Sequence, residues 1–296
     1  MKKTFILLTS VILLISCNND NIVNNGNTSE NNILSTLNNY NKKFLNNSNN
    51  QKKDPPKVDK MKALKLGLVD AAAAVGVGPV WRVPIVGPYA GLWLSFGASW
   101  AAAGESAEAQ DKKVITKSVN SNEIESLINL YSNISNPLNE IGVAHNKALI
   151  ELASNHISMI NENNRIIEEV TDYMVSTPFM KTTFNERLNF VADNQNKDFI
   201  VKNFNNSSNI RTFDDLNNQI NSNPFSSRTQ KDFILSISSF LENNSDEINQ
   251  IVITEYIDGL EEMTIDDDTL NEVERNELLS FLSILNHSYC LWLIAN

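Results

Sequence analysis

Histidine and cysteine are the side chains best suited to catalysis or metal binding, and the 296-residue chain holds three histidines and two cysteines. His145 and His156 are 11 residues apart, which on a helix gives them one face but separates them by about 16 Å. One metal ion cannot bridge that distance. His287 and Cys290 could supply two ligands, but nothing nearby in the sequence offers a third and a fourth. The sequence therefore predicts no metal site and no cofactor.

His145 stands at a core position of an expected helix, with Asn146 beside it. This pattern favours a buried imidazole that hydrogen-bonds to Asn146 over a catalytic or ligand role. The chain has no GxSxG, HExxH or phosphate-binding glycine loop, so we expect a protein that is not an enzyme. A hydrolase that uses His145 remains the third hypothesis. Cys290 is expected to be a small core residue.

Three consecutive aspartates, 266–268, invite a calcium interpretation. An EF-hand loop started at the first of them would place Asn271 where glycine is required, so the match fails. Carboxylates ahead of a helix are better explained by capping and by the helix dipole. Thr269 followed by Glu272 fits a capping box that would start the last helix.

The N-terminus combines a positive start, Lys2 and Lys3, with an apolar run over residues 5–15 and a Ser-Cys pair at its end. It resembles a bacterial lipoprotein signal, 1–16, in which Cys17 would carry a diacylglycerol and become the mature N-terminus. The alternative is an ordinary secretory signal with an incidental cysteine. Two acyl chains give stable attachment, so the expected location is the cell membrane or outer membrane, facing the periplasm or the surface.

Residues 17–56 are dominated by asparagine, which cannot bury enough apolar surface to offset backbone entropy. They are expected to form a disordered tether that follows the lipidated cysteine. A weak helical spacing leaves a short partner-induced helix as the alternative. It runs through Ile33, Leu34, Leu37, Tyr40 and Phe44.

Residues 57–110 concentrate glycine, alanine and tryptophan and are expected to form a helical hairpin. The first helix would run from near Asp59 to Ala74, and the second from Pro88 to about residue 109. Small residues recur at every fourth position of the second helix, where they would let another backbone approach closely. This small-residue stripe consists of Gly87, Gly91, Ser95, Ser99 and Ala103.

The hairpin also contains a run of 22 uncharged residues between Arg82 and Glu105. Prolines at its start leave too short an apolar helix for a clear membrane span. Three interpretations stay open. The hairpin could pack in the core of the folded domain, engage a membrane or partner through residues 64–104, or span a membrane. Asp70 favours packing, because an unpaired carboxylate is costly in hydrocarbon.

From residue 120 to residue 296 the apolar periodicity is helical, and no alternating run is long enough for a sheet. The sequence therefore predicts an all-α fold, a helical bundle preceded by the hairpin. Asn136 is expected to cap the second of these helices, with Pro137 at its first position. The expected helices cover residues 123–134, 136–159, 166–175, 178–193, 213–220, 228–243, 246–263 and 269–292.

Two short segments resemble motifs of uncharacterised bacterial envelope lipoproteins. Residues 142–149, Gly-Val-Ala-His-Asn-Lys-Ala-Leu, are similar to a Gly-x-x-His-Asn-x-x-Leu motif. Residues 287–292, His-Ser-Tyr-Cys-Leu-Trp, are similar to a C-terminal ending, with spacing that differs by one residue. In those proteins the glycine-rich segment follows the bundle, whereas here it precedes the bundle. The resemblance implies an architecture and no specific activity.

The net charge of the chain limits the classes of partner that we expect. Lys and Arg number 24 against 35 Asp and Glu, a net charge of −11, so we expect no nucleic-acid binding. The expected partners are a membrane, through the anchor at Cys17, and a protein. The sequence thus predicts a lipid-anchored binding or structural protein of the cell envelope. The alternative is a membrane-active protein, toxin-like or bacteriocin-like, that uses the hairpin over 64–104.

Overall fold

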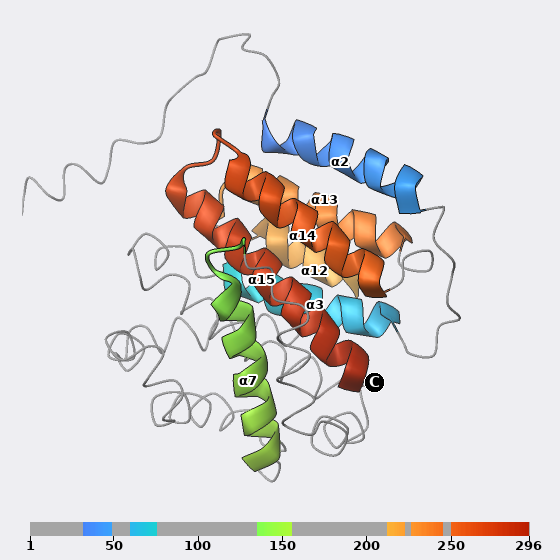
Figure 1. The fold of residues 1–296 in the computed structure, drawn as a ribbon, viewed down its shortest axis with the longest axis vertical. Helices are drawn as coiled ribbons and strands as arrows, with labels where there is room; N and C mark the ends of the chain where they lie inside the picture. The colour runs from blue at the N-terminus through green and yellow to red at the C-terminus, as the bar shows by residue number, and fades with distance from the viewer. Residues whose placement is uncertain are drawn as a thin grey trace, which may run out of the picture. The chain divides into compact units, whose positions relative to one another are not determined.

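The computed structural model describes segments of the unit Asn32–Asn296. These segments hold seven helices and no strand (Figure 1), which confirms the predicted all-α fold. The described residues are 32–48, 60–75, 135–155, 212–222, 226–244 and 250–295. The helices are α2 (Ile33–Ser48), α3 (Lys60–Val75), α7 (Asn139–Asn155), α12 (Phe213–Ser222), α13 (Arg228–Asn244), α14 (Gln250–Asp266) and α15 (Glu272–Ala295).

Helix α15 forms the centre of the described core. Every residue from Glu277 to Leu293 is buried, and α3, α7 and α14 pack against it. Figure 1 shows α14 and α15 side by side, in orange and dark red. A helix that is buried on all faces needs apolar or small residues all round, not a single stripe. This explains why α15 lacks a clear amphipathic pattern.

Helix α3 is the second buried helix and matches the first helix of the expected hairpin, Asp59 to Ala74. Leu64, Leu68 and Ala71 have no exposed surface. The helix packs mainly against α15 and also meets α12 and α13. The second helix of the hairpin lies outside the described residues.

Helices α12 and α13 pack against each other and confirm the expected helices 213–220 and 228–243. Each begins with a reciprocal cap. Thr212 Oγ1 accepts from the Asp215 amide at 3.1 Å, and Asp215 Oδ2 accepts from the Thr212 amide at 2.9 Å. Ser227 and Gln230 repeat this arrangement at the start of α13. The expected helices 123–134, 166–175 and 178–193 lie outside the described residues.

The start of α15 differs from the expected capping box of Thr269 and Glu272. Asn271 Oδ1 accepts from the Glu274 amide at 3.0 Å, and Glu274 Oε2 accepts from the Asn271 amide at 3.3 Å. The Thr269 hydroxyl instead donates to Asp267 Oδ1, so it is engaged in the turn that precedes the helix. Asp267 Oδ1 also accepts from the Leu270 amide, as expected for a carboxylate that orders a turn.

Residues 33–48 overturn part of the disordered tether expected over 17–56. They form α2, which packs against α13 and α14. Ile33 and Leu37 are fully buried, so the weak apolar spacing is the inner face of a docked helix. Asn32 caps this helix, because its Oδ1 accepts from the Ser35 amide at 3.0 Å.

Candidate functional site

A buried cluster of polar side chains joins α3, α7 and α15. We call it the polar core cluster. Each of its members is at most 5% exposed, and it includes the two residues, His145 and Asn146, that the sequence indicated as a possible polar site. The members are Asp70, His145, Asn146, His287, Ser288 and Trp292.

Asp70 is the only acidic residue of α3 and has no exposed surface. The Ser288 hydroxyl donates to its Oδ2, and Trp292 Nε1 donates to the same oxygen at 3.1 Å. His145 Nε2 lies 3.8 Å from that oxygen. A buried carboxylate is tolerated only where hydrogen bonds or an opposite charge compensate its lost hydration. Asp70 therefore ties α3 to both α7 and α15.

His145 and His287 extend the cluster along the α7–α15 interface. His145 Nδ1 lies 3.2 Å from Asn146 Oδ1, which confirms the predicted hydrogen bond between neighbours. Asn146 Nδ2 donates to the His287 carbonyl at 2.8 Å. His287 Nε2 lies 2.9 Å from Asn139 Oδ1, and because an amide oxygen only accepts, this nitrogen carries the proton.

Burial, and then the electrostatic effect of the neighbouring His145, lower the pKa of His287 to about 4. The ring is therefore neutral at pH 7, which agrees with a single proton on Nε2. Acid would force a charge onto His287 in this buried interface, beside His145. Stability of the α7–α15 contact should consequently depend on pH.

Two glycines allow the backbones to come close around this cluster. A Cβ on Gly142 would lie 2.3 Å from His287 Cδ2 and 2.5 Å from the Ser283 carbonyl oxygen. The Gly142 amide donates to Ser283 Oγ at 3.0 Å. On α3, a Cβ at Gly67 would lie 3.0 Å from the Tyr289 amide nitrogen. Even a methyl group would therefore clash with the Ser283 backbone at Gly142, and it would be tightly confined at Gly67.

The turn before α7 is fixed by Asn136, the residue expected as its cap. Its Oδ1 accepts from the Leu138 amide at 2.8 Å, and its Nδ2 donates to Glu261 Oε1 at 2.6 Å and to the Leu279 carbonyl at 3.1 Å. The side chain therefore holds its own turn and also links α7 to α14 and α15. The regular helix begins at Asn139, later than the expected Pro137.

The polar core cluster has the geometry of a packing contact. Ser288 directs its hydroxyl to Asp70, and the surrounding side chains leave the cluster buried. A substrate would have to displace core residues to reach His145. Cys290 is buried, as predicted for a small core residue. Among the described residues, no group of three His, Cys, Asp or Glu side chains could hold a metal ion.

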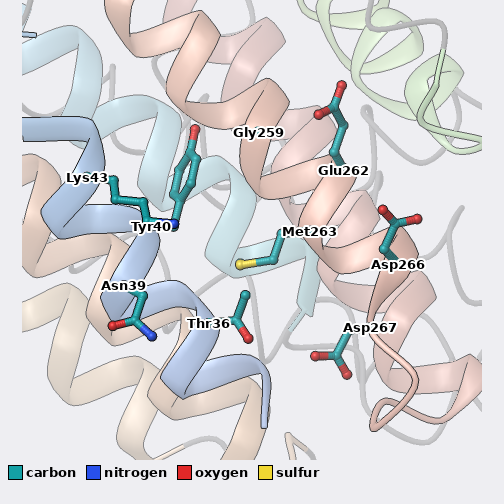
Figure 2. A pocket seen from close by; sticks show the side chains of 9 residues that line it. All are labelled: Thr36, Asn39, Tyr40, Lys43, Gly259, Glu262, Met263, Asp266 and Asp267. Carbon is teal, nitrogen blue, oxygen red and sulfur yellow. The ribbon is translucent and has the colours of Figure 1, made fainter. Parts of the chain in front are cut away.

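A second region is open to solvent and lies between α2 and α14. We call it the α2–α14 groove. It encloses about 600 Å³, which is within the range of ligand pockets. Figure 2 shows four α2 side chains on one side and the α14 side chains on the other. The lining residues are Thr36, Asn39, Tyr40, Lys43, Gly259, Glu262, Met263, Asp266 and Asp267.

Tyr40 attaches α2 to α14 at this groove. Its hydroxyl donates to the Tyr256 carbonyl at 3.1 Å, and a Cβ on Gly259 would lie 2.1 Å from that hydroxyl oxygen. The Tyr40 ring stacks on the Tyr256 ring with centroids 5.6 Å apart, and Phe44 and Phe240 extend the aromatic contact. Burial raises the pKa of Tyr40, so its hydroxyl remains a donor at neutral pH.

Several carboxylates lie along α14, and two of them, Glu262 and Asp266, line the groove. Glu255, Asp258, Glu262 and Asp266 follow one another at helical spacing along α14. Burial, and then repulsion by Glu262 and Glu255, raise the pKa of Asp258 to about 6. The carboxylates on this part of the surface therefore repel one another, and the ionised form of Asp258 is disfavoured.

Sequence reasoning did not identify this groove. Two sequence patterns contribute to the groove, the apolar spacing that begins at Ile33 and the acidic spacing along α14. Each pattern alone is typical of an ordinary surface helix. Only the docking of α2 brings the two together. Cys17 and the small-residue stripe, Gly87, Gly91, Ser95, Ser99 and Ala103, lie outside the described residues.

No protein-family model, curated protein or solved structure matches the chain. The two segments that resemble envelope-lipoprotein motifs, 142–149 and 287–292, contact each other in the polar core cluster. None of the described helices is long and apolar enough to cross a membrane. The described part of the hairpin over 64–104 is buried at residues 64, 66–72, which favours packing over membrane engagement for these residues.

Proposed function

We propose that this chain is a lipid-anchored binding protein of the cell envelope. Cys17 would attach it to the membrane, and the α2–α14 groove would take the partner or ligand. The observation that carries the proposal is the open cavity of about 600 Å³ between α2 and α14. Cavities of this size that combine apolar walls with a few polar groups are typical of binding sites.

The contrast with the polar core cluster supports binding over catalysis. The described histidines, His145 and His287, and the described cysteine, Cys290, are buried on α7 and α15. The groove instead presents amide, hydroxyl, carboxylate and ammonium groups beside Tyr40 and Met263. These groups suit recognition by hydrogen bonds and charge.

The anchor supports a role at a surface. The apolar run of residues 5–15 and the cysteine at its end are what a lipoprotein signal requires. We expect mass spectrometry of the mature protein to find a diacylated Cys17 at its N-terminus. A Cys17→Ala variant should lose its association with membranes. An unmodified thiol in the membrane-bound protein would contradict this part of the proposal.

Binding is tested with adjacent asparagines of α2. Asn38 and Asn39 are both exposed, but only Asn39 lines the groove. Asn39→Trp should fill the opening, whereas Asn38→Trp adds the same side chain outside it. Fluorescence anisotropy would compare labelled basic, acidic and uncharged peptides of equal length.

The proposal predicts that at least one peptide class binds, that Asn39→Trp weakens it about tenfold or more, and that Asn38→Trp has little effect. The failure of all three classes to bind would contradict the groove as a peptide-binding site. Equal effects of Asn38→Trp and Asn39→Trp would mean that the peptide binds outside the groove.

A further inference from the structure

The α2–α14 groove is asymmetric in charge. Glu262, Asp266 and Asp267 line it from the α14 side, and Lys43 lines it from α2. Within the described residues, Glu262 and Asp266 take part in no ion pair. Since Glu262 and Asp266 are both exposed, their charges are available to a partner.

We propose that the α2–α14 groove binds a peptide segment of a partner protein that carries Lys or Arg at alternate positions. This inference rests on the proposed binding function and names the chemical class of its partner. Charge complementarity with the carboxylates along α14 is its basis.

Spacing favours a peptide in extended form. Glu262 and Asp266 are separated by one helical turn on α14, so their Cβ atoms lie roughly 6 Å apart. Alternate residues of an extended chain are spaced by about 6.6 Å and point the same way. Two basic side chains separated by one residue could therefore meet the two carboxylates together.

The remaining lining residues suit the rest of such a peptide. Figure 2 shows Met263 pointing from α14 toward α2, and it lines the groove together with Thr36 and Tyr40. The thioether and the tyrosine ring can contact the methylene stems of Lys or Arg. Asn39 and Thr36 can hydrogen-bond to a peptide backbone. Lys43 would repel a basic side chain, which directs the cations toward α14.

Repulsion among the carboxylates of α14 also favours the binding of a cationic side chain. Burial, and then repulsion by Glu262 and Glu255, raise the pKa of Asp258. A bound cation would relieve part of this repulsion, because opposite charges stabilise the ionised form. Binding of the basic peptide should therefore lower the pKa of Asp258 and release a fraction of a proton near pH 6.

The test uses the full mature protein and a fluorescein-labelled peptide of alternating Lys and Ser. Glu262→Gln combined with Asp266→Asn should weaken binding about tenfold, since each exposed ion pair contributes modestly. The control combines Asp268→Asn with Glu140→Gln, two exposed carboxylates outside the groove. It changes the net charge equally and should have less than about a threefold effect.

Several outcomes would overturn the inference. Equal weakening by both double variants would mean that only the overall charge attracts the peptide. Spermine that competes as well as the peptide at equal charge would identify a small polycation as the ligand. An acidic or uncharged peptide that binds more tightly, and is lost in Asn39→Trp, would refute the basic partner while leaving the proposed binding function intact.

Discussion

The polar core cluster and the α2–α14 groove use the same type of side chain in opposite ways. In the cluster, Asp70 is fully buried and receives hydrogen bonds from Ser288 and Trp292. In the groove, Glu262 and Asp266 are exposed on one side of an open cavity. A compensated buried carboxylate fixes how helices pack, whereas exposed neighbouring carboxylates retain an unsatisfied attraction for cations.

This difference separates what holds the fold together from what is available for binding. Substitutions in the cluster should reduce stability. Substitutions in the groove should change binding and leave stability nearly unchanged. The following predictions test this separation, starting from the largest expected effect.

Asp70→Ala should have the largest effect on stability. It removes the acceptor of Ser288 and Trp292 and leaves His145 beside a cavity, so we expect a loss of about 4 kcal/mol in the free energy of unfolding. Asp70→Asn keeps an acceptor of the same shape and should lose less. Urea denaturation measures both. A loss below about 1 kcal/mol for Asp70→Ala would mean that the cluster does not hold α3 in place.

Gly142→Ala should destabilise the protein by about 3 kcal/mol, because its Cβ would meet the Ser283 backbone and the His287 ring. Gly67→Ala should cost less, since its closest contact would be 3.0 Å. At Gly259 the nearest atoms belong to the end of the Tyr40 side chain, which can move. Because that side chain docks α2 on α14, Gly259→Ala should weaken this docking, alter peptide binding and reduce stability less than Gly142→Ala does. The opposite order among these alanines would contradict the packing described.

His287 should make stability fall in acid. Its pKa in the folded protein is about 4, below the ordinary histidine value of 6.5, so the unfolded chain binds the extra proton first. Its contribution is constant above pH 6.5 and is lost as the pH falls from 6.5 to 4, by about 3 kcal/mol in total. A His287→Gln variant, compared with the wild type over this range, should lack that loss. Parallel stability curves would contradict the assignment.

Asp258→Asn should give the smallest effect, with the opposite sign. The raised pKa of Asp258, about 6 against an ordinary aspartate value of 3.8, means that its ionisation costs more in the folded protein. This residue favours the folded state at low pH, and that contribution is lost as the pH rises through 6. The variant should therefore be more stable at pH 7.5, by at most about 1 kcal/mol. Thermal denaturation at pH 7.5 and pH 4 would measure it, and a gain only at pH 4 would contradict the sign.

Local patterns predicted the helices whose limits are set by neighbouring residues. The ends of α3, α12 and α13 agree with the expected ranges to within two residues. The burial of His145 and its contact with Asn146 were also predictable, because both follow from a core position and an adjacent partner. These features depend on short stretches of sequence, where helical periodicity and local hydrogen bonding are informative.

Features that depend on distant contacts were not predictable in this way. The asparagine-rich composition around α2 indicated disorder, yet contacts of Tyr40 and Phe44 with α13 and α14 stabilise a helix there. At the start of α15, the sequence predicted a capping box of Thr269 and Glu272, but Thr269 is engaged in the turn made by Asp267 and Asn271 is the cap. Tertiary packing decided the first case, and competition between local hydrogen bonds decided the second.

Hydrogen–deuterium exchange of α2 tests the account most directly, because the groove exists only if this helix is docked. The account predicts slow exchange of the amides from Leu37 to Phe44 in the free mature protein. Adding the peptide of alternating Lys and Ser should slow exchange in α2 and α14 further, and leave α3 and α15 unchanged. Exchange of these α2 amides at the rate of an unfolded chain, with or without the peptide, would contradict it.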